Sequence, residues 1–108
     1  MSKTYAHYLQ HQDQYNLNLA CVPFAKASTY GVFLVGSCLD RPDFRDVDIR
    51  CMLPDDQYKA MEAFVEPLNA AVSEWFRQRT GLPVDFQFQD FTETNKKHDG
   101  KRSALGIL

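Results

Sequence analysis

Two carboxylates at alternate positions of an expected strand, Asp46 and Asp48, constrain this chain more than any other feature of its sequence. Alternate residues of a strand point to the same face, so these two side chains stand next to each other. An apolar run predicts a buried strand over 31–36, which ends at Gly36 and Ser37. Adjacent carboxylates repel each other unless a cation or water screens them. Such oxygen ligands suit Mg²⁺, which takes one or two carboxylates together with the phosphates of a substrate.

The remaining pattern predicts a small α+β domain. The three main strands are expected over 31–36, 46–53 and 83–89. A helix is expected from residue 55 to a stop at Gly81, with a kink or split near Pro67. Helical spacing also predicts a helix over part of 14–29, where Pro23 argues against one continuous helix.

Side-chain parity places the carboxylates relative to the core. An apolar stripe on the helix after residue 55 is expected to cover the sheet: Tyr58, Met61, Phe64, Val65, Leu68, Val72, Trp75 and Phe76. A strand–helix–strand crossover puts both strands in one sheet with the helix on one face. Val84, Phe86 and Phe88 then face the helix, and Asp85 points to the opposite face. We therefore expect a small mixed sheet with helices on one face and Asp46, Asp48 and Asp85 on the other.

Length and charge limit the alternatives. The 108 residues suit a single domain spanning 1–108, with a polar flank at 1–16 and a tail at 92–108 that is basic and then apolar. The apolar end of this tail is expected to fold back onto the body. The net charge of −2 predicts no strongly basic surface for nucleic acid. A basic cluster in the tail is either a solvated surface or a weak contact for nucleic acid or triphosphate: Lys96, Lys97, Lys101 and Arg102.

The cysteines and histidines predict no structural metal or disulfide framework. Three cysteines without CxxC spacing favour a reducing cytoplasm. No apolar run is long enough to cross a bilayer, and we expect no signal peptide. His7 and His11 have the i,i+4 spacing of a helical metal pair, but no third ligand is evident, so an exposed pair is the preferred interpretation. All three histidines, including His98, lie in the flanks, which argues against a nucleophilic role for Ser37.

Three segments together resemble the signature of the DNA polymerase β-type nucleotidyltransferase superfamily: Gly36-Ser37, Asp46-Val47-Asp48-Ile49 and Val84-Asp85-Phe86. The chain is similar, over roughly residues 30–107, to small nucleotidyltransferase-like proteins common in phages and bacteria. The phrases that carry this similarity are Leu34-Val35-Gly36-Ser37, Arg41-Pro42-Asp43-Phe44-Arg45-Asp46-Val47-Asp48, Gly81-Leu82-Pro83-Val84-Asp85-Phe86-Gln87 and Ala104-Leu105-Gly106. If the chain is phage-encoded, the cytoplasm is that of the host.

The resemblance implies a two-metal mechanism. Asp46 and Asp48 would hold two Mg²⁺ or Mn²⁺ ions, one of which carries the β- and γ-phosphates of an NTP. The second ion would lower the pKa of an attacking hydroxyl, and Asp85 would share that ion or accept the proton. A nucleoside monophosphate would be joined to an acceptor, with release of pyrophosphate.

The resemblance also implies a phosphate grip made by Gly36, Ser37 and nearby backbone N–H groups. The larger relatives often carry an Arg-Gly shortly after the Gly-Ser pair, whereas this chain has Cys38-Leu39-Asp40-Arg41-Pro42. Arg41 or Arg45 would supply the positive charge instead.

The acceptor, whether protein, RNA or a small molecule, is not specified by the sequence. About 19 residues follow the third strand, too few for an independent acceptor-binding domain. Recognition would then need the basic tail, the second subunit of a homodimer or another protein. The alternative hypothesis is a catalytically silent NTP-binding or protein-interaction module on the same scaffold.

Overall fold

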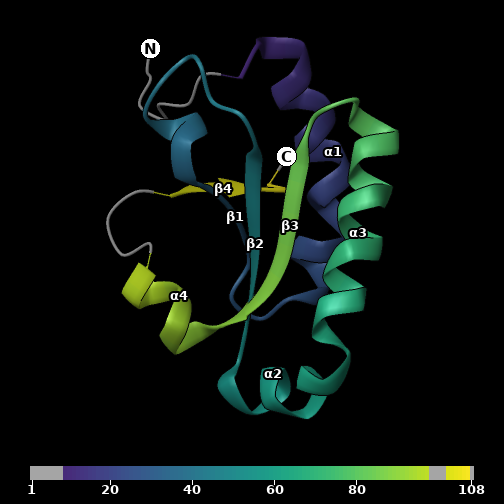
Figure 1. Cartoon of the computed structure of the whole chain (residues 1–108), viewed down its shortest axis with the longest axis vertical. Helices are drawn as coiled ribbons and strands as arrows, with labels where there is room; N and C mark the ends of the chain where they lie inside the picture. The colour runs from purple at the N-terminus through teal and green to yellow at the C-terminus, as the bar shows by residue number, and fades with distance from the viewer. Residues whose placement is uncertain (1–8, 98–101, 108) are drawn as a thin grey trace.

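A four-stranded mixed sheet organises the chain, in the order β3-β2-β1-β4 (Figure 1). The computed structural model describes residues 9–97 and 102–107. The strands are β1 (Val32–Val35), β2 (Val47–Leu53), β3 (Val84–Asp90) and β4 (Ser103–Leu105). β1 pairs antiparallel with β2 and β4, and β2 pairs parallel with β3. The α+β class and the three expected strands are confirmed, each to within a residue at either end. The strand number is corrected to four, because the apolar end of the tail folds back as β4.

The first helix differs from its prediction. The helical segments are α1 (His11–Ala27), η1 (Gly36–Leu39), α2 (Asp55–Met61), η2 (Glu62–Phe64), α3 (Val65–Thr80) and α4 (Phe91–Lys97). α1 runs unbroken through Pro23, so the expectation of a discontinuous helix there was wrong. Pro23 lacks the N–H that would bond the carbonyl of Leu19. Both residues are exposed, so water can satisfy that carbonyl in place of the missing donor.

The long second helix is split, as predicted, around Pro67. The 3₁₀ turn η2 separates α2 from α3, and Pro67 lies in the first turn of α3, where the missing N–H interrupts no helical bond. The same turn breaks the phase of the expected apolar stripe, because a 3₁₀ helix has three residues per turn. Phe64 and Leu68 are therefore 71% and 39% exposed, and their assignment to the core was wrong. Gly81 ends α3 in the left-handed region, with φ of +73°.

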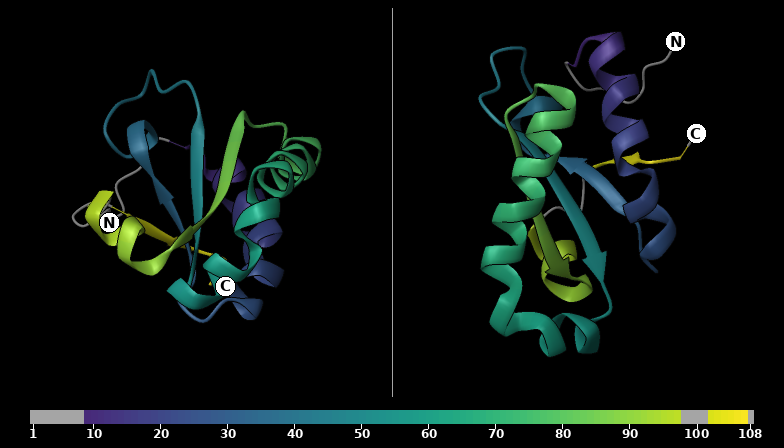
Figure 2. Two further views of the ribbon diagram at one scale, coloured as in Figure 1. Left: turned by 60° about the horizontal axis from the view of Figure 1, so that its bottom comes forward. Right: turned by 90° about the vertical axis from the view of Figure 1, so that its right-hand side faces the viewer.

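Helices α1 and α3 cover one face of the sheet (Figure 2). An aromatic cluster fills the space between them and β3. The ring centroid of Phe24 lies 5.4 Å from that of Phe76 and 5.3 Å from that of Phe86, and Phe76 stacks on Phe86 at 5.4 Å. Such ring pairs add to the stability gained from burial. This core fixes the orientation of β3 and hence the side from which Asp85 projects.

The opposite face, called here the carboxylate face, is defined by the strand residues that point away from α1 and α3: Phe33, Val35, Asp48, Arg50, Met52, Asp85, Gln87 and Gln89. α4 packs on this face, against β2 and β3, so the expectation that all helices lie on one face was wrong (Figures 1 and 2). The carboxylate of Asp90 caps α4 by accepting the N–H of Glu93 at 2.6 Å. Thr94 is fully buried and donates to the backbone carbonyl of Asp90 at 2.7 Å.

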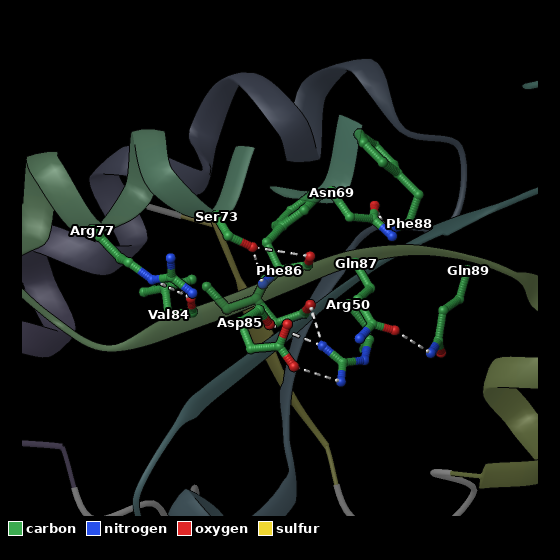
Figure 3. Close-up of polar contacts among 11 residues, drawn as sticks. Arg50, Asn69, Ser73, Arg77, Val84, Asp85, Phe86, Gln87, Phe88 and Gln89 are labelled. Atoms are coloured by element: carbon green, nitrogen blue, oxygen red, sulfur yellow. Dashed lines mark hydrogen bonds and ion pairs between the residues drawn. The ribbon is translucent and has the colours of Figure 1, made fainter. Parts of the chain in front are cut away.

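The outer edge of β3 is sealed by polar side chains of α3 (Figure 3). They are spaced four residues apart: Asn69, Ser73 and Arg77. Ser73 Oγ accepts the N–H of Phe86 at 2.8 Å and donates to its carbonyl at 3.2 Å. Asn69 and Arg77 bond the backbone two residues to either side of Phe86, at 2.9 and 3.0 Å. These bonds replace a neighbouring strand and remove a template for edge-to-edge association.

The three cysteines, Cys21, Cys38 and Cys51, are buried and form no disulfide. Burial raises the pKa of Cys21 to about 12 and that of Cys51 to about 11. Both thiols are therefore protonated at neutral pH and poorly reactive.

Candidate cation and phosphate site

Asp48 and Asp85 are direct neighbours in the parallel β2–β3 ladder. Adjacent strands lie about 4.8 Å apart, so the two carboxylates extend side by side from the carboxylate face. Val35, the last residue of β1, is the partner of Asp48 on the other side. Strands β1, β2 and β3 therefore bring Asp48, Asp85 and the end of β1, which Gly36 follows, close together.

The third predicted carboxylate, Asp46, is exposed and directly precedes β2. Its charge is felt at the pair: the pKa of Asp48 is raised by burial first, and then by the nearby charges of Asp85 and Asp46. The guanidinium of Arg50 acts in the opposite direction and lowers that pKa. The raised pKa shows that the folded protein holds Asp48 in surroundings that disfavour its charged form.

Gly36 lets the carboxylate of Asp48 approach the backbone at the end of β1. Its φ is +82°, and a Cβ placed on Gly36 would collide with Oδ2 of Asp48. Ser37 follows in η1, where its carbonyl accepts the N–H groups of Asp40 at 2.9 Å and Arg41 at 3.0 Å. The Gly36–Ser37 turn and the Asp48 carboxylate are thus one structural unit.

The two arginines expected to grip phosphate lie in the loop between η1 and β2. Arg41 Nε pairs with Asp43 Oδ1 at 3.5 Å, and both side chains are exposed. Arg45 is exposed directly before Asp46. The structure does not place either guanidinium on the carboxylate pair, and their role in phosphate binding stays a prediction.

Arg50 is a component of the site that the sequence reasoning missed. Its side chain is only 10% exposed, and its Nη2 lies 3.5 Å from Oδ2 of Asp85 (Figure 3). Its Nη1 donates to the carbonyls of Ile49 and Asp85, each at 2.9 Å. Its Nε is buried and has no hydrogen-bond partner in the described part of the chain. The signal was available, since Arg50 continues the alternation of Asp46 and Asp48 on β2.

The donor chemistry of this end of the sheet fits a hard divalent cation. Asp46 and Asp48 offer carboxylate oxygens, and Mg²⁺ completes its coordination with water and phosphate rather than with an all-protein cage. The side chains of residues 9–97 and 102–107 do not gather three or more His, Cys, Asp or Glu groups into a ready-made metal cage. Asp85 lies beside Asp48 as expected, and the feature that was not expected is its ion pair with Arg50.

The predicted basic cluster is only partly described. Lys96 is exposed on α4. The guanidinium of Arg102 lies over the ring of Phe33 at 4.9 Å and donates to Oδ1 of Asn95 at 3.0 Å. Lys101 and the side chain of Lys97 lie outside the described residues. The structure therefore brings Arg102 onto the carboxylate face and leaves its contact with nucleic acid as a prediction.

Of the histidines, His11 is exposed at the start of α1, and His7 and His98 lie outside the described residues.

Comparison with models of known families, with curated proteins and with solved structures finds no match to this chain. The resemblance to nucleotidyltransferases therefore depends on the sequence phrases given above and has no support from these comparisons. Across the helices of the described ranges, none has both the length and the apolar character of a membrane span.

Proposed function

We propose that the carboxylate face binds an NTP together with a divalent cation and transfers its nucleoside monophosphate to an acceptor. The observation that carries this proposal is the pairing of Asp48 with Asp85 beside the Gly36 turn. Arg50 compensates part of this charge, but the pKa of Asp48 remains raised by burial and by the neighbouring carboxylates, and a bound cation would offset that cost.

Each residue has a role that its position supports. Asp46 and Asp48 would hold the cation, which would neutralise charge on the phosphates and help a hydroxyl to ionise. The turn at Gly36 and Ser37 lets the polyphosphate approach the backbone closely. The acceptor oxygen forms a bond to the α-phosphorus, the bond to the β-phosphate oxygen breaks, and pyrophosphate leaves. Asp85, oriented by Arg50, takes the proton of the acceptor hydroxyl.

A second candidate function is NTP binding without transfer. The hold of Arg50 on Asp85 favours it, because a carboxylate paired with a guanidinium is a weaker base and a less available ligand. Both candidate functions require the cation and the nucleotide. They differ only in whether the nucleoside monophosphate is transferred to an acceptor.

Calorimetric titration with ATP and GTP, with and without Mg²⁺, tests the shared part of the proposal. We expect binding that requires Mg²⁺ and is lost in Asp46→Asn and Asp48→Asn. Asp56→Asn is the matched control, since Asp56 is an exposed acid at the start of α2. Equal binding by all three variants, or binding without Mg²⁺, would contradict the proposal.

Incubation with α-labelled NTPs and a cell lysate then separates the two candidates. Label transferred to an acceptor by the wild type and not by Asp48→Asn supports the enzyme. Mg²⁺-dependent binding without any transfer supports the silent module.

A further inference from the structure

We infer that Arg50 is a built-in cation that replaces one of two metal ions, so that the site takes a single divalent ion. This inference rests on the proposed function and makes it narrower. It assigns Asp46 and Asp48 to the metal, and it assigns Asp85 to Arg50.

The guanidinium of Arg50 is fixed beside Asp85 by the backbone. Its Nη1 bonds two carbonyls, those of Ile49 and Asp85, and its Nη2 faces the Asp85 carboxylate at 3.5 Å (Figure 3). The side chain is nine-tenths buried, so it has little room to swing away. A Mg²⁺ ion lies about 2.0–2.1 Å from its ligand oxygens, so an ion bound to Oδ2 of Asp85 would lie directly beside this guanidinium.

The position of Arg50 makes a purely structural role a weaker explanation. Its Nε is buried without a partner in the described chain, which is an incomplete arrangement for a charge kept only for stability. Asp48 is the direct ladder neighbour of Asp85, so the guanidinium that faces Asp85 also lies near Asp48. One guanidinium therefore acts on both ladder carboxylates, as a bridging metal ion would.

The local charge matches one ion. Asp48 and the three groups whose charges act on it, Asp46, Asp85 and Arg50, together carry two negative charges, which a single divalent cation neutralises. A second ion beside Asp85 would lie next to a fixed positive charge that cannot be deprotonated. That repulsion opposes a second site even where ligands are available.

The test is titration of the full chain with Mn²⁺ alone, with bound ions counted by calorimetry and free Mn²⁺ followed by electron paramagnetic resonance. We expect one bound ion in the wild type and in Arg50→Lys, which keeps the charge, and two in Arg50→Met. The control is Arg79→Met, because Arg79 stacks on Trp75 at 4.3 Å, away from the site, and should leave one ion. Two ions in the wild type, or one in Arg50→Met, would overturn the inference.

Two further variants keep the inference testable if Arg50→Met fails to fold. In the wild-type background, Asp48→Asn should weaken Mn²⁺ binding by more than about 10–100-fold, the range for removal of a group that only orients a ligand. Asp85→Asn should weaken it clearly less than Asp48→Asn does, because Asp85 contributes charge near the ion but no ligand oxygen. Equal losses in the two variants would overturn the inference while leaving the proposed function in place. Absence of Mn²⁺ binding in the wild type would overturn both.

Discussion

The carboxylate face has two ends, and the fold treats them differently. At one end, α4 covers the sheet, Met52 and Thr94 are buried, and Arg102 packs over Phe33. At the other end, Asp48 and Asp85 lie side by side and only partly covered.

The two ends of the carboxylate face contribute differently to the stability of this small domain. The covered end is packed and its polar groups are paired, as in any protein interior. The carboxylate end places like charges together and raises the pKa of one of them. Truncation of a buried side chain should therefore lower stability at the covered end, whereas replacement of Asp46 or Asp48 at the carboxylate end should affect ligand binding and cost little stability.

The largest effect on stability is expected for Met52→Ala, at the covered end. Met52 is 2% exposed and lies under Arg102, whose Nη1 contacts its sulfur at 3.5 Å. Loss of a buried Met side chain typically costs about 2–5 kcal/mol of the free energy of unfolding. Urea denaturation would measure it. A loss no larger than that caused by Asp48→Asn would break the comparison between the two ends.

Gly36→Ala should have the next largest effect, because it strains the backbone and collides with Asp48. We expect a loss of about 1–3 kcal/mol in the free energy of unfolding, as for other residues forced into a sparsely populated region. Part of the loss should disappear when Asp48→Ala is made in the same chain, since the colliding oxygen is then absent. A double-mutant cycle measures this coupling, and strict additivity of the two changes would contradict the close packing of Gly36 and Asp48.

The smallest effect is the pH dependence that Asp48 contributes. Burial raises its pKa in the folded state above the ordinary value of 3.8, so in the interval above pH 3.8 the folded protein binds more protons than the unfolded chain. Stability from this group is therefore greatest at low pH and falls as the pH rises through the raised pKa. Asp48→Asn should remove that fall and be at least as stable as the wild type at neutral pH. A difference in unfolding free energy between the two proteins that grows in favour of the wild type with rising pH would contradict this sign.

The sequence predicted the parts of the fold that follow from periodicity. The alternation of Val84, Phe86 and Phe88 placed β3 and the direction of Asp85, and Gly81 marked the end of α3. α4 was missed because it carries no apolar stripe: among the side chains described for residues 91–96, the buried one is the polar Thr94. The sequence feature that indicates the start of this helix is the Asp90-x-x-Glu93 spacing, which is similar to a capping box.

The sequence predicted which carboxylates share a face, but it did not predict that Arg50 pairs with one of them. Parity on β2 and β3 brought Asp48 and Asp85 to one face. The alternation of side chains along a strand does not show how far a long side chain reaches along that face. Arg50 lies opposite Gln87 in the β2–β3 ladder, but its guanidinium reaches the carboxylate of Asp85, two residues earlier in β3. The same limit applies to Arg41, which pairs with Asp43 in the loop.

The most direct test of cation binding at Asp46 and Asp48 is an NMR titration of the protein with Mn²⁺, which broadens the signals of nuclei close to the ion. The two ends of the carboxylate face then report separately through the backbone amides. If Asp46 and Asp48 hold the ion, broadening should appear first at residues 36, 37, 46–48 and 85, and the amides of α4 should be affected only at higher concentration. Broadening that begins at Asp90 and Glu93, or that is uniform over the molecule, would contradict cation binding at Asp46 and Asp48.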